Sequence, residues 1–274
     1  MSPREIIDEG DALDVLRWWA TAGVEHLYED APRNRFEEAA RPPPPRAARP
    51  APVVATPPVI APAVAAPDAA ARTAAEWAAQ AHTLDALREA MLRFDGCALK
   101  KTATQLVFAD GAPGAAVMIV GEAPGGDEDR IGRPFVGRAG QLLDRMLAAI
   151  GLDRTGVYIA NVVPWRPPGN RTPTAQETAI CLPFIRRQIE LCGPRILVTM
   201  GNPSTQTLLG VKEGITRIRG VWRSYEIAPG RSVPALPTLH PAYLLRSPAA
   251  KRWSWLDLRA LRAALDAEAI THIR

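Results

Sequence analysis

The sequence contains little cysteine and no long apolar run. Its three cysteines, Cys97, Cys181 and Cys192, are odd in number and widely spaced, which argues against a disulfide framework and predicts a reducing compartment, the cytoplasm. No uninterrupted stretch of about 18 apolar residues occurs, so no membrane-spanning helix is expected. The N-terminus, MSPREIIDEGDALD, is acidic where a secretory signal is basic and then apolar, so export is not expected.

The net charge of the chain is small. The chain has 33 Lys and Arg against 29 Asp and Glu, a net charge of +4, and 47% of its residues are hydrophobic. This balance excludes a wholly disordered chain and leaves enough apolar surface for a packed core. The small basic excess is compatible with a nucleic-acid partner but does not by itself identify one.

Proline divides the chain into three predicted parts. Ten prolines fall within residues 41–67, a density that excludes a helix interior or a central strand and favours extended polyproline conformations. We therefore expect an N-terminal helical segment at 1–40, a disordered Pro/Ala-rich linker at 41–72 and a folded domain at 73–274. The helical pattern at 12–20 would dock on the domain or bind a partner protein. The linker is either a passive spacer or a docking site for a proline-binding partner.

Short apolar runs alternate with helical patterns in the predicted domain. Such alternation is typical of a parallel sheet covered by helices on both faces, an α/β architecture. The expected strands span 115–120, 157–162 and 195–200, and the expected helices span 73–94, 138–150, 175–191, 203–209 and 253–269. In such folds ligands bind beyond the carboxyl ends of the strands, so the loops that follow the strands form the candidate site.

The loop after the first expected strand is rich in glycine and acid. Residues 121–140 hold six glycines together with Glu122, Asp127, Glu128 and Asp129. No Gly-Lys-Ser/Thr follows, and GxGxxG is missing, so this is not a nucleotide-phosphate loop. An acidic loop suits an oriented water or a hydrogen-bond acceptor better than a phosphate.

Polar residues also follow the later strands. Asn161 ends the second strand, where its carboxamide can both donate and accept toward a planar base; a turn cap is the alternative. His240 follows an apolar strand and precedes a proline, a position that favours a functional over a structural histidine. The cations in these loops that could bind phosphates are Arg166, Arg171, Arg246, Lys251 and Arg252.

An apolar tripeptide follows His240. Tyr243, Leu244 and Leu245 are expected to form an exposed tip between cations, as in proteins that insert a wedge into a base stack while gripping phosphates. The alternative is that Leu244 and Leu245 begin a buried helix.

Three linked segments carry the most specific pattern in the chain. They are GEAPG…ED…GRPFVGRAGQLL, NVV.WRPPGNRTP and HPAYLLR. In this order they resemble the uracil-DNA glycosylase superfamily, in particular its family 4, the iron–sulfur type, over about residues 88–262. The resemblance implies a three-layer α/β/α fold with a central, mostly parallel four-stranded sheet. It also implies a monofunctional DNA repair enzyme that flips uracil out of DNA and hydrolyses its N-glycosidic bond, leaving an abasic site.

The resemblance implies a role for each motif residue. Phe135 would stack on the extruded uracil, and Asn161 would hydrogen-bond its O4 and N3 edge and reject cytosine. Glu128 would crowd C5 and exclude the methyl group of thymine, Glu122 would place the attacking water, and His240 would stabilise the charge that develops on O2. The remaining implied contacts are Gly121 and Ala123 to the substrate and Arg166, Arg171, Leu244, Leu245, Arg246 and Lys251 to DNA. Ala123 stands where other superfamily members carry an aspartate base.

The chain departs from family 4 at its cysteines. Family 4 proteins ligate a 4Fe–4S cluster with four cysteines. Only Cys97 and Cys181 match ligand positions here, whereas Phe94 and Trp165 occupy the other two and Cys192 lies elsewhere. We expect no cofactor and no metal, with a packed apolar plug in place of the cluster.

Other functions stay open at this point. The altered cysteines favour a catalytically retired DNA-binding or scaffold protein, whereas Glu122, Asn161 and His240 favour an enzyme. A glycosylase for hypoxanthine, xanthine or mismatched thymine is a further alternative. The motifs contain no lysine nucleophile for lyase chemistry, and no His-containing insert follows the first motif, so turnover without covalent trapping is expected. The expected partner is uracil-containing DNA, bound without a membrane by a monomer in the nucleoid-associated bacterial cytoplasm.

Overall fold

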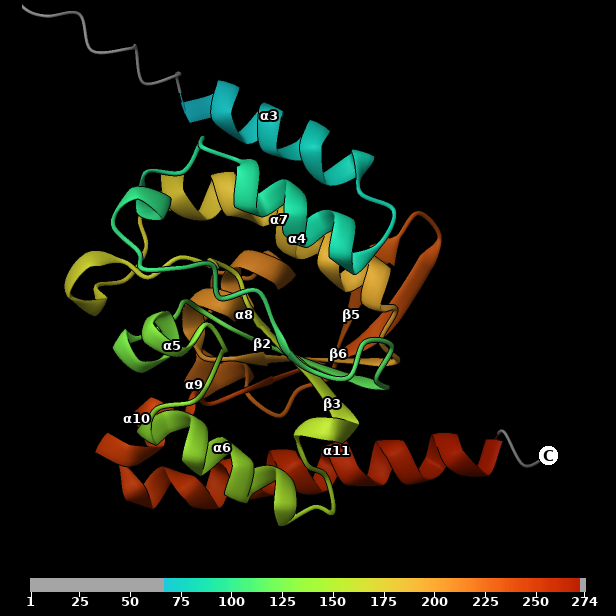
Figure 1. The fold of residues 1–274 in the computed structure, drawn as a ribbon. Coiled ribbons are helices and arrows are strands. Elements are labelled where there is room, and N and C mark those ends of the chain that lie inside the picture. Colours follow the sequence, from blue (N-terminus) through green and yellow to red (C-terminus); the bar gives the residue numbers. More distant parts are fainter. Residues whose placement is uncertain (1–66, 272–274) are drawn as a thin grey trace, which may run out of the picture. The chain divides into compact units, whose positions relative to one another are not determined.

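The computed structural model describes residues 67–271, and a six-stranded sheet lies at the centre of this part of the chain (Figure 1). The strand order is β1-β3-β2-β4-β6-β5. The strands are β1 (Asp110–Gly111), β2 (Val117–Gly121), β3 (Val157–Asn161), β4 (Ile196–Met200), β5 (Arg223–Ala228) and β6 (Arg231–Thr238). The four inner strands run parallel to one another, and the two edge strands, β1 and β5, are antiparallel to their neighbours.

The predicted α/β class and mostly parallel sheet are confirmed, but the expected count of four strands is wrong. The two additional strands lie at the edges and lack the continuous apolar pattern of a buried strand. β1 is only two residues long. β5 is half-exposed, with Tyr225 and Ile227 buried between exposed neighbours. Edge strands of this kind produce alternation or no pattern at all, which explains why no apolar run predicted β1 or β5.

Helices cover both faces of the sheet (Figure 1). The α-helices are α3 (Pro67–Gln80), α4 (Leu84–Arg93), α5 (Gly126–Ile131), α6 (Arg138–Ala148), α7 (Ala175–Cys192), α8 (Asn202–Leu209), α9 (Ile215–Ile218), α10 (Pro241–Arg246) and α11 (Lys251–Thr271). Successive residues of β2 point into two different cores. Met118 and Val120 pack with residues of α3, α4, α7 and α8. Val117 and Ile119 pack with residues of α6, α10 and α11.

The first described helices differ from the expected single helix at 73–94. α3 begins at Pro67, inside the segment 41–72 that was expected to be a linker. Proline is tolerated in the first turn of a helix, so its density did not mark the boundary. This helix ends at Gln80, and a second helix, α4, begins at Leu84. Thr83 caps α4 by accepting a 3.1 Å hydrogen bond from the Ala86 amide. The expected helix at 12–20 and the linker up to residue 66 lie outside the described residues.

Every helix within residues 67–271 is too short or too polar to span a lipid bilayer.

The four inner strands have their carboxyl ends on the same side of the sheet. β2 ends at Gly121, β3 at Asn161, β4 at Met200 and β6 at Thr238. The loops that follow these strands therefore meet at that edge.

Candidate active site

A cavity of about 640 Å³ lies at the carboxyl ends of the inner strands. Its lining includes eight residues singled out from the sequence: Glu122, Ala123, Glu128, Phe135, Asn161, Arg171, His240 and Arg246. The structure thus brings residues from three separate loops into one site, as the parallel topology predicts. The cavity is completed by residues that the sequence did not single out, among them Met200 and Ile215.

Gly121 lies directly beneath the two side chains expected to hold a base. The β2–β3 register pairs Gly121 with Asn161. A Cβ atom at Gly121 would come within 2.5 Å of Asn161 Oδ1 and 2.6 Å of Phe135 Cζ. A side chain at this position would displace both groups, so the site requires glycine at this close approach.

Phe135 and His240 lie against one another in the cavity. Their ring centroids are 5.3 Å apart with an interplanar angle of 27°. Phe135 is buried, and its φ of 55° is in the left-handed region, which a bulky residue rarely adopts. The phenyl ring and the imidazole therefore present an aromatic surface and a polar edge to the same space.

The protonation of His240 follows from its place at the start of α10. His240 is the N-cap of this helix, and its Nδ1 accepts a 3.1 Å hydrogen bond from the Ala242 amide. Nδ1 therefore carries no proton, and in the neutral ring the proton is on Nε2. Burial and, to a smaller extent, the charge of Arg246 lower the pKa of His240 from 6.5 to about 4, and the charge of Glu128 partly opposes this shift. At neutral pH His240 is an uncharged imidazole whose Nε2–H is a donor.

Glu122 is the carboxylate with the clearest sign of desolvation at this site. Its Oε1 atom is buried and has no hydrogen-bond partner among the described residues. Burial raises the pKa of Glu122, and a hydrogen bond from the Thr172 hydroxyl partly opposes this rise. A carboxyl group with a raised pKa beside a cavity is suited to accept a proton from water.

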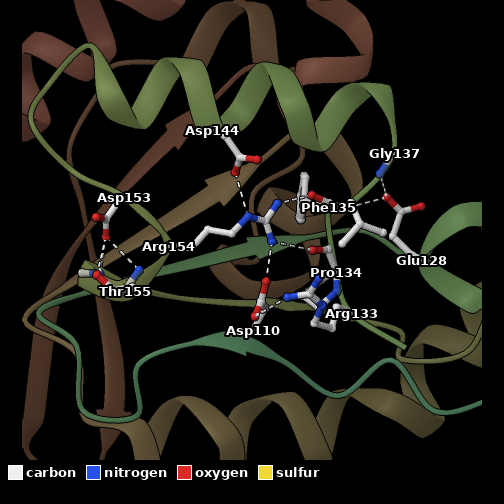
Figure 2. A network of polar contacts seen from close by, with 12 residues as sticks. Asp110, Glu128, Arg133, Pro134, Phe135, Gly137, Asp144, Asp153, Arg154 and Thr155 are labelled. Atoms are coloured by element: carbon white, nitrogen blue, oxygen red, sulfur yellow. Dashed lines mark hydrogen bonds and ion pairs between the residues drawn. The ribbon is translucent and has the colours of Figure 1, made fainter. Parts of the chain in front are cut away.

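Glu128 is bound to the backbone of its own loop. Its Oε2 accepts from the Gly125 amide at 3.1 Å, and its Oε1 accepts from the amides of Val136 and Gly137 at 2.9 and 2.8 Å. Figure 2 shows the last of these bonds beside Phe135. The carboxylate therefore joins the start of α5 to the segment that follows Phe135. Its expected contact with C5 of a base stays a prediction.

The residues expected to contact DNA are not all exposed. Leu244 is fully buried in the core beneath α10, so the expectation of an exposed tip is wrong at this position. The six-residue helix α10 turns its first leucine, Leu244, inward and leaves its second, Leu245, 38% exposed. Arg246 and Lys251 are exposed as well.

Two of the expected phosphate-binding arginines have partners within the protein. Arg171 donates to both carboxylate oxygens of Glu177, at 2.7 and 2.8 Å. This bond lowers the pKa of Glu177 to about 2. Arg166 donates from Nε to Asn170 at 2.7 Å. Both guanidinium groups therefore stabilise the loop after β3, whatever else they bind.

The sequence did not predict the residues that support the site from outside. Thr172, which bonds Glu122, lies in the quoted NRTP segment, so its neighbourhood was known but its role was not. Arg154 donates to the carbonyl oxygens of Pro134 and Phe135. It lies in a polar turn that follows no periodic pattern, so nothing in the sequence singles it out.

The four positions expected to match cluster ligands share one hydrophobic core. Phe94, Cys97, Trp165 and Cys181 are all buried in one core. The Cys181 thiol donates to Cys97 Sγ across 3.9 Å. That hydrogen bond, together with burial, raises the pKa of Cys181.

Aromatic packing occupies the rest of this region. Phe94 packs edge-on against Trp77 and Phe184, with ring centroids 5.9 and 5.0 Å away. Within the described residues no group of three or more His, Cys, Asp or Glu side chains is arranged to hold a metal. Two thiols and two aromatic rings do not match the four thiolates that a 4Fe–4S cluster requires.

The fold and cavity define a class of protein. An aromatic face, a carboxamide and a neutral imidazole donor at the carboxyl edge of a parallel sheet form a pocket for a planar heterocycle. Comparison with known proteins supports this assignment. The family described as "Uracil DNA glycosylase superfamily" matches residues 108–261. The chain belongs to this superfamily.

Individual relatives make the resemblance to family 4 specific. The chain is 39% identical over 188 residues to the Type-4 uracil-DNA glycosylase of Sulfurisphaera tokodaii, covering 66% of this chain and 84% of that protein. It is 41% identical over 165 residues to the Type-4 enzyme of Thermotoga maritima, with 60% and 84% coverage. It is 38% identical over 193 residues to that of Saccharolobus solfataricus, with 69% and 89% coverage. The predicted resemblance to family 4 is confirmed.

Proposed function

We propose that this protein is a DNA repair enzyme that hydrolyses the N-glycosidic bond of uracil in DNA and leaves an abasic site. The observation that carries the proposal is His240, a neutral imidazole with an Nε2–H donor in the same cavity as Asn161 and Phe135. The relatives named Type-4 uracil-DNA glycosylases, at 38–41% identity, support the same substrate.

The cavity offers a distinct partner for each part of the base. Uracil presents the O4 acceptor and the N3–H donor on one edge, which the Asn161 carboxamide can match with its own donor and acceptor. Cytosine reverses this pattern and would leave buried polar groups unpaired. The Phe135 ring supplies a stacking face. Because a base inside a duplex cannot reach such a pocket, the reaction requires the nucleotide to be flipped out.

His240 acts on the charge that develops as the bond breaks. Cleavage leaves negative charge on uracil and an oxocarbenium-like sugar, so a donor aimed at O2 stabilises the transition state more than the ground state. Such preorganised donors commonly contribute about 3–4 kcal/mol. Since the imidazole is uncharged, it donates a hydrogen bond without transferring a proton. Water then adds to the sugar carbon, and Glu122, whose pKa burial raises, orients that water and accepts its proton.

Further contacts to DNA are proposed around the cavity mouth. Arg246 lines the cavity and is exposed, and Lys251 and Leu245 are exposed close by in sequence. These cations would bind phosphates next to the flipped nucleotide, and Leu245 would contact the space that the base vacates. Arg166 and Arg171 would contribute through the loop that they stabilise.

A panel of damaged oligonucleotides tests the function. The protein is incubated in excess over single- and double-stranded substrates that carry uracil, hypoxanthine, xanthine or mismatched thymine, and the released base is quantified. The proposal expects uracil to be released fastest. Faster release of another base would assign the enzyme to that substrate, and DNA binding without release of any base would support a retired member of the superfamily.

We also propose that the domain functions without an iron–sulfur cluster. The support is the donor set described above, in which Phe94 and Trp165 stand at two ligand positions and only Cys97 and Cys181 supply sulfur. Purified protein should contain less than stoichiometric iron and lack broad absorbance near 400 nm. Stoichiometric iron with that absorbance would overturn the proposal.

The remaining proposals concern assembly and location. We propose a monomer in the cytoplasm, associated with the nucleoid through DNA, whose N-terminal segment or proline-rich linker binds a protein partner. Light scattering would test the oligomeric state. Deletion of residues 1–66 would test the N-terminal part: unchanged folding, activity and pull-down partners would refute a role in binding.

A further inference from the structure

Phe135 is held in a conformation that its own chemistry disfavours. Its φ of 55° places a bulky aromatic residue in the left-handed region. The other non-glycine residue with positive φ among the described residues is Asn170, a residue type that tolerates this region. A conformation that costs on the order of 1 kcal/mol or more persists only where the surroundings impose it. The contacts of the peptide groups around Phe135 show what imposes it.

Two charged side chains hold the backbone on either side of Phe135 (Figure 2). Arg154 Nη1 donates to the Pro134 carbonyl at 3.1 Å, and Arg154 Nη2 donates to the Phe135 carbonyl. Glu128 Oε1 accepts from the next two amides, as described above. The peptide group between Phe135 and Val136 is therefore bound at its carbonyl by a cation and at its amide by an anion, which fixes its direction.

Arg154 is itself held in place by two carboxylates from different parts of the fold. Its Nη1 lies 2.5 Å from Asp110 Oδ2, in β1, and its Nε lies 2.7 Å from Asp144 Oδ1, in α6. Figure 2 shows the guanidinium between these groups and the two carbonyls. The planar guanidinium of Arg154 thus donates to two carboxylates and two carbonyls at once. An ammonium group cannot reproduce this geometry.

Close packing leaves the turn no alternative position. A Cβ atom at Gly140, in the first turn of α6, would lie 1.6 Å from the Phe135 carbonyl oxygen. On the other side of the residue, the phenyl ring lies over Gly121 and against His240. The backbone of Phe135 is thus fixed behind the cavity, and its ring is the part that reaches into it.

We propose that Arg154 is a positioning residue for base excision: by binding the Pro134 and Phe135 carbonyls from behind the cavity, it keeps the Phe135 ring at the stacking position. This inference rests on the proposed function. Arg154 is not among the residues that line the cavity, so its effect on the reaction passes through Phe135.

The decisive variant is Arg154→Lys. Lysine keeps a positive charge between Asp110 and Asp144 but cannot bind both carbonyls, so it separates the ion pairs from the positioning. We expect a thermal midpoint close to that of wild type and a single-turnover rate of uracil release lower by about 10- to 100-fold, because displacement of a binding group by about 1 Å has that effect. Affinity for an oligonucleotide with an abasic site should stay within about two-fold, since no base is present to stack.

A double-mutant cycle shows whether the effect passes through the ring. In a Phe135→Ala background, Arg154→Lys should change the rate less than two-fold. Arg262→Lys is the matched control, because Arg262 forms an ion pair with Asp266 on α11, outside the cavity lining, and its replacement should leave the rate unchanged. Equal rate losses in both backgrounds, or no loss in the wild-type background, would overturn the proposal.

A spectroscopic readout keeps the proposal distinct from the proposed function. The chain has five phenylalanines, so fluorophenylalanine labelling gives few ¹⁹F signals, and Phe135→Ala identifies the one from Phe135. Arg154→Lys should shift or broaden that signal and leave the other four unchanged. An unchanged signal would refute the positioning role even if uracil is released. A shifted signal in a protein that releases no uracil would refute the proposed function instead.

Discussion

The neutral state of the half-buried His240 predicts a specific loss of stability in acid. The folded-state pKa is about 4 and the ordinary value is 6.5. Between these values the unfolded chain binds a proton that the folded chain excludes, so the free energy of unfolding falls as the pH drops from 6.5 to 4 and is fully restored above 6.5. At about 1.36 kcal/mol for each tenfold change in proton affinity, the difference between these two pKa values amounts to about 3 kcal/mol.

The matched variant for this measurement is His240→Asn. Asparagine is a good helix N-cap, so it can accept a hydrogen bond at the start of α10 but does not titrate. Urea unfolding of both proteins at pH 7 and pH 4, followed by circular dichroism, isolates the histidine, because the other titrating groups are common to both. Wild type should lose about 3 kcal/mol more than the variant on acidification. Equal losses in the two proteins would refute the neutral assignment.

Three further substitutions test other parts of the account. Glu122→Gln should slow single-turnover release and remove the acidic limb of its pH profile, since burial raises the pKa of the carboxyl group that must be ionised; an unchanged limb would assign it elsewhere. Gly140→Ala should destabilise the domain by about 1–3 kcal/mol and slow release together, because the added Cβ meets the Phe135 carbonyl; calorimetry beside the rate assay checks both. The buried Asp257 forms an ion pair with Arg219. Asp257→Ala should lower the free energy of unfolding in urea by about 3–5 kcal/mol, because it leaves Arg219 without its partner. The exposed pair at Asp266 is the control, and Asp266→Ala should change stability little.

The inner sheet and the cavity could be predicted because both rest on repeating patterns. Buried parallel strands are continuous apolar runs, and their carboxyl ends meet at one edge, so Glu122, Asn161 and His240 could be grouped before any contact was known. The edge strands could not be found in the same way. β1 is too short for a pattern, and β5 alternates within a polar stretch.

Individual side-chain contacts could not be predicted from the sequence, because they depend on how distant parts of the fold pack together. Leu244 and Leu245 are chemically identical neighbours, and only the orientation of α10 on the core decides that one is buried and the other exposed. The tautomer of His240 depends on a hydrogen bond within one helical turn. Arg154 acts through acceptors between 10 and 44 positions away, on β1, on α6 and before it, and such long-range convergence leaves no local signal.

The most direct test of uracil excision is single-turnover cleavage of a uracil-containing oligonucleotide by wild type, His240→Ala and Asn161→Asp. The account predicts release by wild type, a loss of about 100-fold or more in His240→Ala, and newly gained release of cytosine by Asn161→Asp. No release of uracil by a folded wild-type protein that binds the DNA, or full activity without His240, would contradict it.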